Sequence, residues 1–231
     1  MEPGIAENLE MVRTVISQAE KASGRRPGTV ELVAVSKTHP PEVIQKAVAA
    51  GQLVFGENRV QEARAKIPEL SSKLRWHLIG HLQSNKVRVA LSLFEIIHGV
   101  DSVDLLMEIQ SSAKQLGVFP KVLLQVNVAG ESSKFGFSPG GLLAQLEAIL
   151  RVDRVEILGL MTIPPIAPSP EASREYFVRL RELRDQVEKE YHILLPHLSM
   201  GMSGDYRVAV EEGATLVRVG TAIFGERVTK Q

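Results

Sequence analysis

A lysine at the end of an apolar run is the main candidate for chemistry in this sequence. Lys37 follows residues 32–36 (LVAVS) and precedes Pro40 and Pro41, which can open a helix. It would therefore lie where a buried strand ends. Burial lowers the pKa of a lysine amine, and a neutral amine attacks aldehydes. Spacing alone leaves a structural alternative open, in which the methylene stem packs and the ammonium reaches water.

Two loops of small residues near the C-terminus could bind an anion. Residues 199–205 read SMGMSGD, and Gly220 and Thr221 follow the last apolar run. Small residues let backbone N–H groups approach an anion, and hydroxyls add donors. Plain turn chemistry is the alternative, with Ser203 or Asp205 capping a helix. A lysine amine facing two such loops suggests a phosphorylated aldehyde, of which pyridoxal 5′-phosphate (PLP) is the obvious example.

The elements that would position these residues are short apolar runs alternating with helical patterns. The runs cover residues 30–36, 53–56, 75–80, 94–100, 121–128, 155–161, 196–200 and 215–219. Runs that are almost continuously apolar are typical of parallel strands buried on both faces. The alternation predicts an α/β fold, a closed (β/α)₈ TIM barrel that forms a single domain over residues 1–231. An open doubly wound sheet is the alternative.

The N-terminal segment adds a helix to this pattern. Its apolar stripe is formed by Ile5, Leu9, Val12, Ile16 and Ala19. In a barrel of this kind the active site lies in the loops after the strands, and phosphate often binds after strands 7 and 8. Lys37 and the two small-residue loops fall at those places.

Composition excludes several other classes of protein. The 231 residues carry no net charge and include no cysteine. We therefore expect no nucleic-acid partner, no disulfide and no thiolate metal site. His77 and His81 are four residues apart, but the apolar alternation around them indicates a strand, so we expect no metal there. No secretory signal or membrane-length apolar stretch is visible, which favours a cytoplasmic protein with no membrane partner.

Longer motifs resemble those of one family. They include residues 55–62 (FGENRVQE), 76–86 (WHLIGHLQSNK) and 218–225 (RVGTAIFG). With other stretches along nearly the whole chain, they resemble the YggS/PROSC family, the pyridoxal phosphate homeostasis proteins. The resemblance implies a fold type III PLP-binding barrel like the N-terminal domain of alanine racemase.

The resemblance also implies a role for each site residue. Lys37 would hold PLP as a Schiff base, and Arg218 would face the pyridine nitrogen. Asn58 and Ser199 would lie beside the cofactor. The phosphate would be bound by Ser203, Gly204, Gly220 and Thr221.

The function implied is homeostasis of PLP, vitamin B6 and amino acids, without catalysis by this chain. A PLP-dependent amino-acid racemase is the alternative, but it needs a second base on the opposite face of the substrate. The chain offers Tyr176, Tyr191 and Tyr206, and it stops soon after the eighth repeat. The first two tyrosines lie on a helical stripe, where packing is the simpler interpretation. We expect a monomer whose partners are PLP and PLP-dependent apoenzymes.

Overall fold

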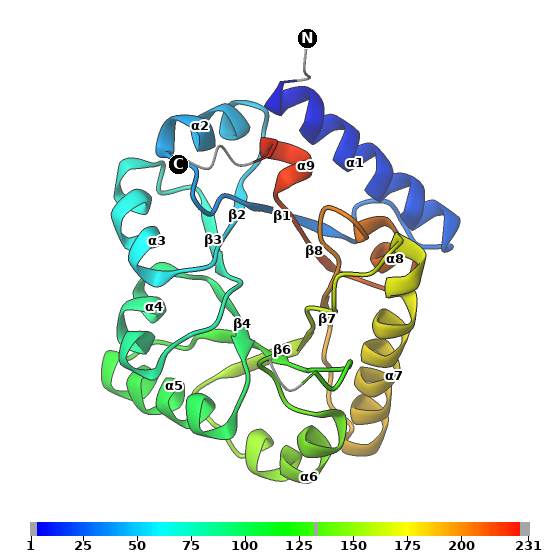
Figure 1. The fold of residues 1–231 in the computed structure, drawn as a ribbon. Coiled ribbons are helices and arrows are strands. Elements are labelled where there is room, and N and C mark those ends of the chain that lie inside the picture. Colours follow the sequence, from blue (N-terminus) through cyan, green and yellow to red (C-terminus); the bar gives the residue numbers. More distant parts are fainter. Residues whose placement is uncertain (1–3, 132–133, 227–231) are drawn as a thin grey trace.

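Eight parallel strands close into a barrel within residues 4–131 and 134–226, the parts of the chain that the computed structural model describes. The strands pair in chain order, and β1 pairs with β8 to close the ring (Figure 1). The predicted barrel is confirmed, and the open sheet is wrong. The strands are β1 (Glu31–Val35), β2 (Val54–Glu57), β3 (Arg75–Leu78), β4 (Ile96–Val100), β5 (Lys121–Gln125), β6 (Glu156–Met161), β7 (His197–Ser199) and β8 (Leu216–Val219).

Helices follow the strands around the outside of the barrel. They are α2 (Pro41–Ala49), α3 (Val60–Lys66), α4 (Val87–Leu93), α5 (Val103–Leu116), α6 (Pro139–Leu150), α7 (Arg174–Tyr191), α8 (Tyr206–Glu211) and α9 (Thr221–Phe224), with short 3-10 turns η1 (Ile67–Glu69), η2 (Ser84–Lys86) and η3 (Pro170–Ser173). The expected N-terminal helix, α1 (Ile5–Ala22), packs against α2, α8 and α9. Asn8 Nδ2 fixes it by donating to the carbonyl oxygen of Ile223 at 2.9 Å. Within the described ranges, no helix has the length and apolar character needed to cross a membrane.

The core has two parts, because side chains along each strand alternate between the two faces of the sheet. In β1, Leu32 and Ala34 belong to the outer core beneath the helices. Val33 and Val35 belong to a separate cluster inside the barrel. A side chain two residues beyond Val35 therefore continues the inner row, and that residue is Lys37.

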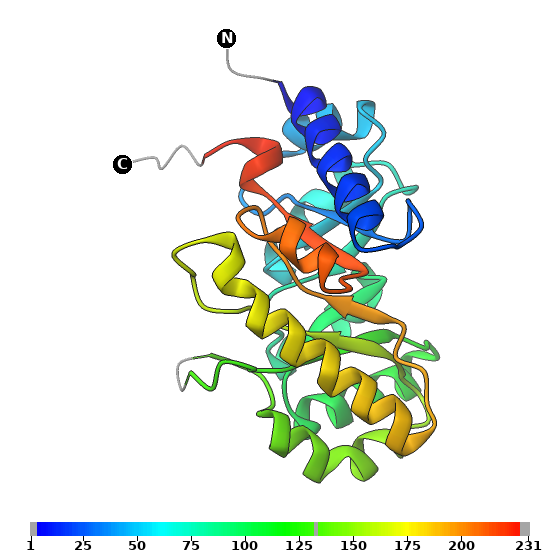
Figure 2. The same ribbon diagram turned by 90° about the vertical axis from the view of Figure 1, so that its right-hand side faces the viewer.

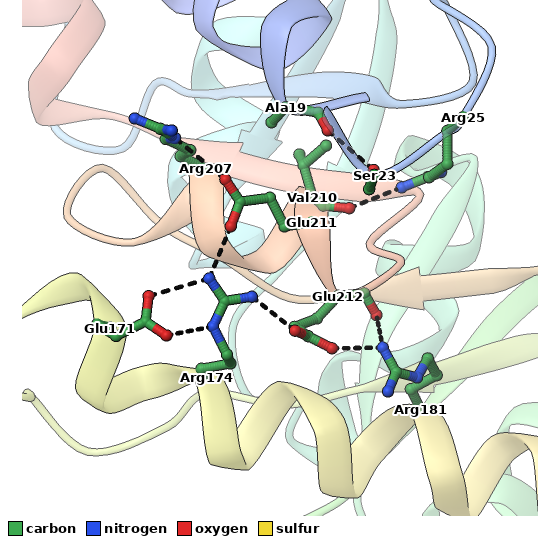
Figure 3. Close-up of polar contacts among 10 residues, drawn as sticks. All are labelled: Ala19, Ser23, Arg25, Glu171, Arg174, Arg181, Arg207, Val210, Glu211 and Glu212. Carbon is green, nitrogen blue, oxygen red and sulfur yellow. Dashed lines mark hydrogen bonds and ion pairs between the residues drawn. The ribbon is translucent and has the colours of Figure 1, made fainter. Parts of the chain in front are cut away.

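Polar contacts hold α8 between α7 and α1 (Figure 3). Arg174, the first residue of α7, pairs with Glu211 at 2.7 Å and Glu212 at 2.6 Å. On the other side, Arg25, just after α1, donates to the carbonyl oxygen of Val210 at 3.1 Å. These contacts fix α8, and with it the loop that precedes it.

Candidate functional site

The carboxyl ends of the strands surround a cavity of about 650 Å³. Figure 2 shows the green loop after β5, the yellow loop after β6 and the red helix α9 after β8 on one side of the barrel. Seven of the eight predicted site residues line the cavity: Lys37, Asn58, Ser203, Gly204, Arg218, Gly220 and Thr221. The eighth, Ser199, is fully buried and hydrogen-bonds Arg218. The structure thus brings all eight to one place, with a volume typical of small-molecule sites.

Lys37 lies in the loop between β1 and α2. It is half-buried and lines the cavity, as the inner row of Val33 and Val35 predicts. The side chain therefore faces the site. Its function as an attachment point stays a prediction.

Arg218 places a buried positive charge at the cavity. Its guanidinium donates to Ser199 Oγ at 2.5 Å and to the carbonyl oxygen of Thr162 at 2.8 Å, and both partners are uncharged. Burial lowers the pKa of Arg218 to about 10, with the charge of Asp205 opposing this effect. The side chain is therefore a cation at neutral pH. A guanidinium has donors but no acceptor, so this group favours an acceptor atom on a ligand.

Two histidines continue the hydrogen-bonded chain of Arg218 and Ser199 into the barrel interior. Ser199 Oγ lies 2.8 Å from His98 Nδ1, and His98 Nε2 lies 3.1 Å from His77 Nδ1. Burial lowers the pKa of His77 to about 4 and that of His98 well below its usual value. Both rings are therefore neutral at pH 7, with one N–H each.

The histidine contacts are compatible with two directions of hydrogen bonding. Ser199 Oγ accepts from the guanidinium of Arg218, and its hydroxyl retains both a second lone pair and a proton for His98 Nδ1. The proton between His98 Nε2 and His77 Nδ1 lies on one ring or the other accordingly. His77 Nε2 is buried and has no hydrogen-bond partner in the described parts of the chain. Both hydrogen-bond acceptors of Arg218, Ser199 Oγ and the carbonyl oxygen of Thr162, are neutral.

The loops after β7 and β8 are joined through Ser203. Its Oγ accepts the backbone N–H groups of Gly220 at 3.1 Å and Ala222 at 3.3 Å. Because both bonds are accepted, the hydroxyl proton can be donated to an anion in the cavity. Asp205 does not cap α8 with its side chain; Oδ1 accepts from the N–H of Met202 at 2.7 Å.

Gly220 is needed for a close approach between the loop after β8 and the end of β1. A Cβ at this position would lie 3.3 Å from Val35 Cβ and 3.4 Å from its carbonyl oxygen. The absence of a side chain lets the loop after β8 lie against the end of β1, beside Lys37.

Several residues of the site were not singled out from the sequence. His39, Ile79 and Ile163 also line the cavity. Ile79 and Ile163 each lie two residues beyond an inward-facing strand position, so the alternation of strand residues could have identified these two. His39 follows the left-handed backbone of Thr38, where this alternation no longer applies. His77 and His81 have different surroundings: His77 contacts His98 inside the barrel, whereas His81 Nδ1 pairs with Asp101 at 2.9 Å.

Comparison with known proteins identifies the family. The family model described as alanine racemase, N-terminal domain, matches residues 6–228. The pyridoxal phosphate homeostasis protein of Aquifex aeolicus is 47% identical over 222 residues, which cover 96% of this chain and 97% of that protein. The protein of the same name from Escherichia coli K12 is 39% identical over 233 residues, covering 96% and 97%. The chain belongs to the pyridoxal phosphate homeostasis protein family.

Solved structures agree with this membership. PipY of Synechococcus elongatus PCC7942, solved with PLP bound, matches with a TM-score of 0.85 at 42% identity, covering 96% of this chain and 100% of that one. An alanine racemase from Clostridium difficile 630 matches with a TM-score of 0.72 at 16% identity, covering 97% of this chain and 58% of that one. The second match shows the shared barrel alone. The family predicted from the sequence motifs is therefore confirmed, together with its alanine racemase-like fold.

Proposed function

We propose that this chain binds PLP at the mouth of the barrel and holds it as a Schiff base on Lys37 without catalysing a reaction. One observation carries the proposal. Lys37, the buried cation of Arg218 and the two small-residue loops all line the same cavity. The relatives named for PLP homeostasis, and PipY solved with PLP bound, support the choice of ligand.

The residues present fit PLP. The pyridine nitrogen of PLP can accept a hydrogen bond from the buried guanidinium of Arg218. The two hydrogen-bond acceptors that Arg218 has within the protein, Ser199 Oγ and the carbonyl oxygen of Thr162, are both neutral. Asn58 Oδ1 is buried with no hydrogen-bond partner among the residues described, so a ligand group can satisfy this side chain. When bound, PLP supplies an aldehyde carbon that reacts with an amine and a ring that can accept electrons.

Each predicted site residue has a place in this proposal. Lys37 supplies the amine, Arg218 hydrogen-bonds the ring nitrogen, and Ser199 orients Arg218. Asn58 lies beside the cofactor. The phosphate is held by Ser203, Gly204, Gly220 and Thr221.

Two features support a role without catalysis. Tyr176, Tyr191 and Tyr206 all pack against the outer core beneath the helices, so no described tyrosine lines the cavity. Arg218 stays protonated at neutral pH, which disfavours a protonated pyridine ring and weakens it as an electron acceptor. An aminotransferase instead uses a carboxylate at that nitrogen.

A racemase remains the second candidate, and it would depend on His39. Apart from Lys37 and Arg218, His39 is the only described cavity-lining side chain that titrates. It lies two residues beyond Lys37 on the same loop, so both groups come from one side of the barrel mouth. Racemisation needs groups on opposite faces of the substrate carbon.

The experiment mixes the PLP-loaded protein with a PLP-dependent apoenzyme. We expect the loaded protein to reactivate the apoenzyme more slowly than free PLP does at equal concentration, because release must wait for hydrolysis of the Schiff base. In parallel, alanine and serine are incubated with the loaded protein and analysed by chiral chromatography. Racemisation at about 10 per second, a typical enzymatic rate, would overturn the proposal in favour of the racemase.

A further inference from the structure

The residue before Lys37 is held by two charged side chains of the β2–α3 segment. Ser36 Oγ donates to Glu57 Oε1 at 2.6 Å. The carbonyl oxygen of Ser36 accepts from Lys66 Nζ at 3.0 Å. Ser36, Glu57 and Lys66 are all buried, so these contacts are shielded from water.

The residue after Lys37 is held by the same segment. The N–H of Thr38 donates to Glu62 Oε1. Thr38 has φ of 67°, in the left-handed region that β-branched residues rarely adopt. Such backbone persists where surrounding contacts over-determine it, and these residues cluster at functional sites. The backbone is therefore fixed on both sides of Lys37.

Lys66 connects the two contacts. Its Nζ lies 2.9 Å from Glu57 Oε1 and 2.8 Å from Glu62 Oε1. Together with the carbonyl oxygen of Ser36, these acceptors account for all three protons of the ammonium group. Lys66 thus links the buried contacts of Ser36 to Glu62, which accepts from the N–H of Thr38.

Stability alone is a poor explanation for this arrangement. Buried ion pairs are often no more stabilising than well-packed apolar residues of the same volume. Burial raises the pKa of Glu57, opposed by hydrogen bonds from Ser36 and the charge of Lys66, and Glu57 Oε2 has no partner among the described residues. The network fixes the backbone of the loop between β1 and α2, which carries Lys37.

We infer that Glu57, Glu62 and Lys66 are positioning residues, which fix the backbone of Ser36 and Thr38 so that the Lys37 amine reaches the aldehyde carbon of the cofactor. This inference rests on the proposed function. It predicts that damage to the network weakens the aldehyde-dependent part of binding and spares the phosphate-dependent part.

The test uses two ligands and the full chain. PLP carries the aldehyde, whereas pyridoxine 5′-phosphate carries an alcohol in its place and cannot form a Schiff base. Equilibrium dialysis measures the affinity of each ligand for the parent and for Lys66→Met. We expect at least a tenfold loss of affinity for PLP and less than a twofold change for pyridoxine 5′-phosphate. Lys114→Met is the matched control, since Lys114 pairs with Asp153 on the surface at 3.0 Å, and it should change neither affinity.

A second pair of variants keeps the inference testable if Lys66→Met does not fold. Glu62 is partly exposed, so its replacement should be tolerated. Glu62→Ala removes the acceptor for Thr38 and should lower PLP affinity selectively, whereas Glu62→Gln keeps an acceptor oxygen and should restore most of it. Equal losses for both ligands, or no loss in Lys66→Met and Glu62→Ala, would overturn the inference.

A failure of the proposed function gives a different result. In that case the parent itself binds PLP and pyridoxine 5′-phosphate equally well, and Lys37→Ala changes neither affinity. A parent that prefers PLP, with network variants that keep this preference, contradicts the positioning role alone.

Discussion

Ser203 accepts hydrogen bonds from two backbone N–H groups of the next loop, those of Gly220 and Ala222. The side chain therefore links the loops after β7 and β8 and still has a proton to donate. Thr221 lines the same cavity. The proposed phosphate site therefore consists of small residues from two loops that Ser203 joins.

Ser203→Ala and Thr221→Val are expected to weaken PLP binding. Each substitution removes a donor to a charged group, which corresponds to about 1.5–3 kcal/mol, or about 10- to 150-fold in affinity. Affinity for unphosphorylated pyridoxal should hardly change. If either variant loses affinity for pyridoxal and PLP alike, the removed hydroxyl does not act on the phosphate.

The histidine pair makes folding sensitive to acid. Burial lowers the pKa of His77 to about 4 from 6.5, and that of His98 is also lowered. Between these values the unfolded chain binds more protons than the folded one. The contribution of the two neutral histidines to the free energy of unfolding is therefore complete above pH 6.5. It decreases as the pH falls towards 4, by about 3 kcal/mol for His77.

His77→Asn should reduce this pH dependence, because asparagine keeps a hydrogen-bonding side chain for His98 and does not titrate in this range. The measurement is the free energy of unfolding in urea between pH 7 and pH 4. His192→Asn is the control, since His192 is exposed at the end of α7. A slope in His77→Asn equal to that of the parent would show that His77 does not contribute to the acid sensitivity.

At the scale of elements, the contacts of Arg174 attach α7 to α8 (Figure 3). Arg174→Met should destabilise the protein by about 1–2 kcal/mol, because the side chain is 30% exposed and its partners Glu211 and Glu212 are 20% and 13% exposed. Arg179→Met on the same helix should lose about 0.5 kcal/mol or less, since Arg179 and Glu175 are more than half exposed. Urea unfolding compares the two, and equal losses would contradict a bridging role for Arg174.

The elements themselves could be predicted because their signal is local. Residues 121–125 and 156–161 are apolar runs of strand length, and the structure has β5 and β6 there. Predicted strands and observed strands differ at their ends. Residues 126–128 extend the apolar run, but β5 stops at Gln125, where the chain turns towards the bridge between Val126 and Phe137.

The polar network inside the barrel could not be predicted from local pattern. Ser199 and His98 lie 101 positions apart, and their contact depends on barrel closure. Lys37 and the two small-residue loops were predicted from residue type and spacing, and the family motifs added Asn58 and Arg218. His98 belongs to an apolar run that indicated only a strand. Lys66 shows the same limit, since its helical position gives no sign that its ammonium lies under Ser36.

At the scale of the whole molecule, closure of the barrel joins the first strand to the last. β1 pairs with β8, so Lys37 at the end of one strand lies near Gly220 and Thr221 at the end of the other. The proposed site therefore has two separate parts, an amine from the first repeat and anion donors from the last two. The monomeric state, the single domain and the cytoplasmic location stay predictions.

Lys37→Ala separates these parts. The variant should lose the absorption of the Schiff base and still bind PLP, because Ser203 and Thr221 are unchanged. Equilibrium dialysis with inorganic phosphate as competitor measures this remaining affinity. A folded variant with no affinity for PLP would mean that the amine supplies most of the binding free energy.

Chemical trapping tests directly whether the cofactor is attached to Lys37. The protein is loaded with PLP, reduced with borohydride to make the linkage permanent, digested and analysed by mass spectrometry. We expect one pyridoxyl adduct per chain, on the peptide that contains Lys37. An adduct on Lys86 or Lys134 in its place, or no adduct on a protein that retains PLP, would contradict attachment at Lys37.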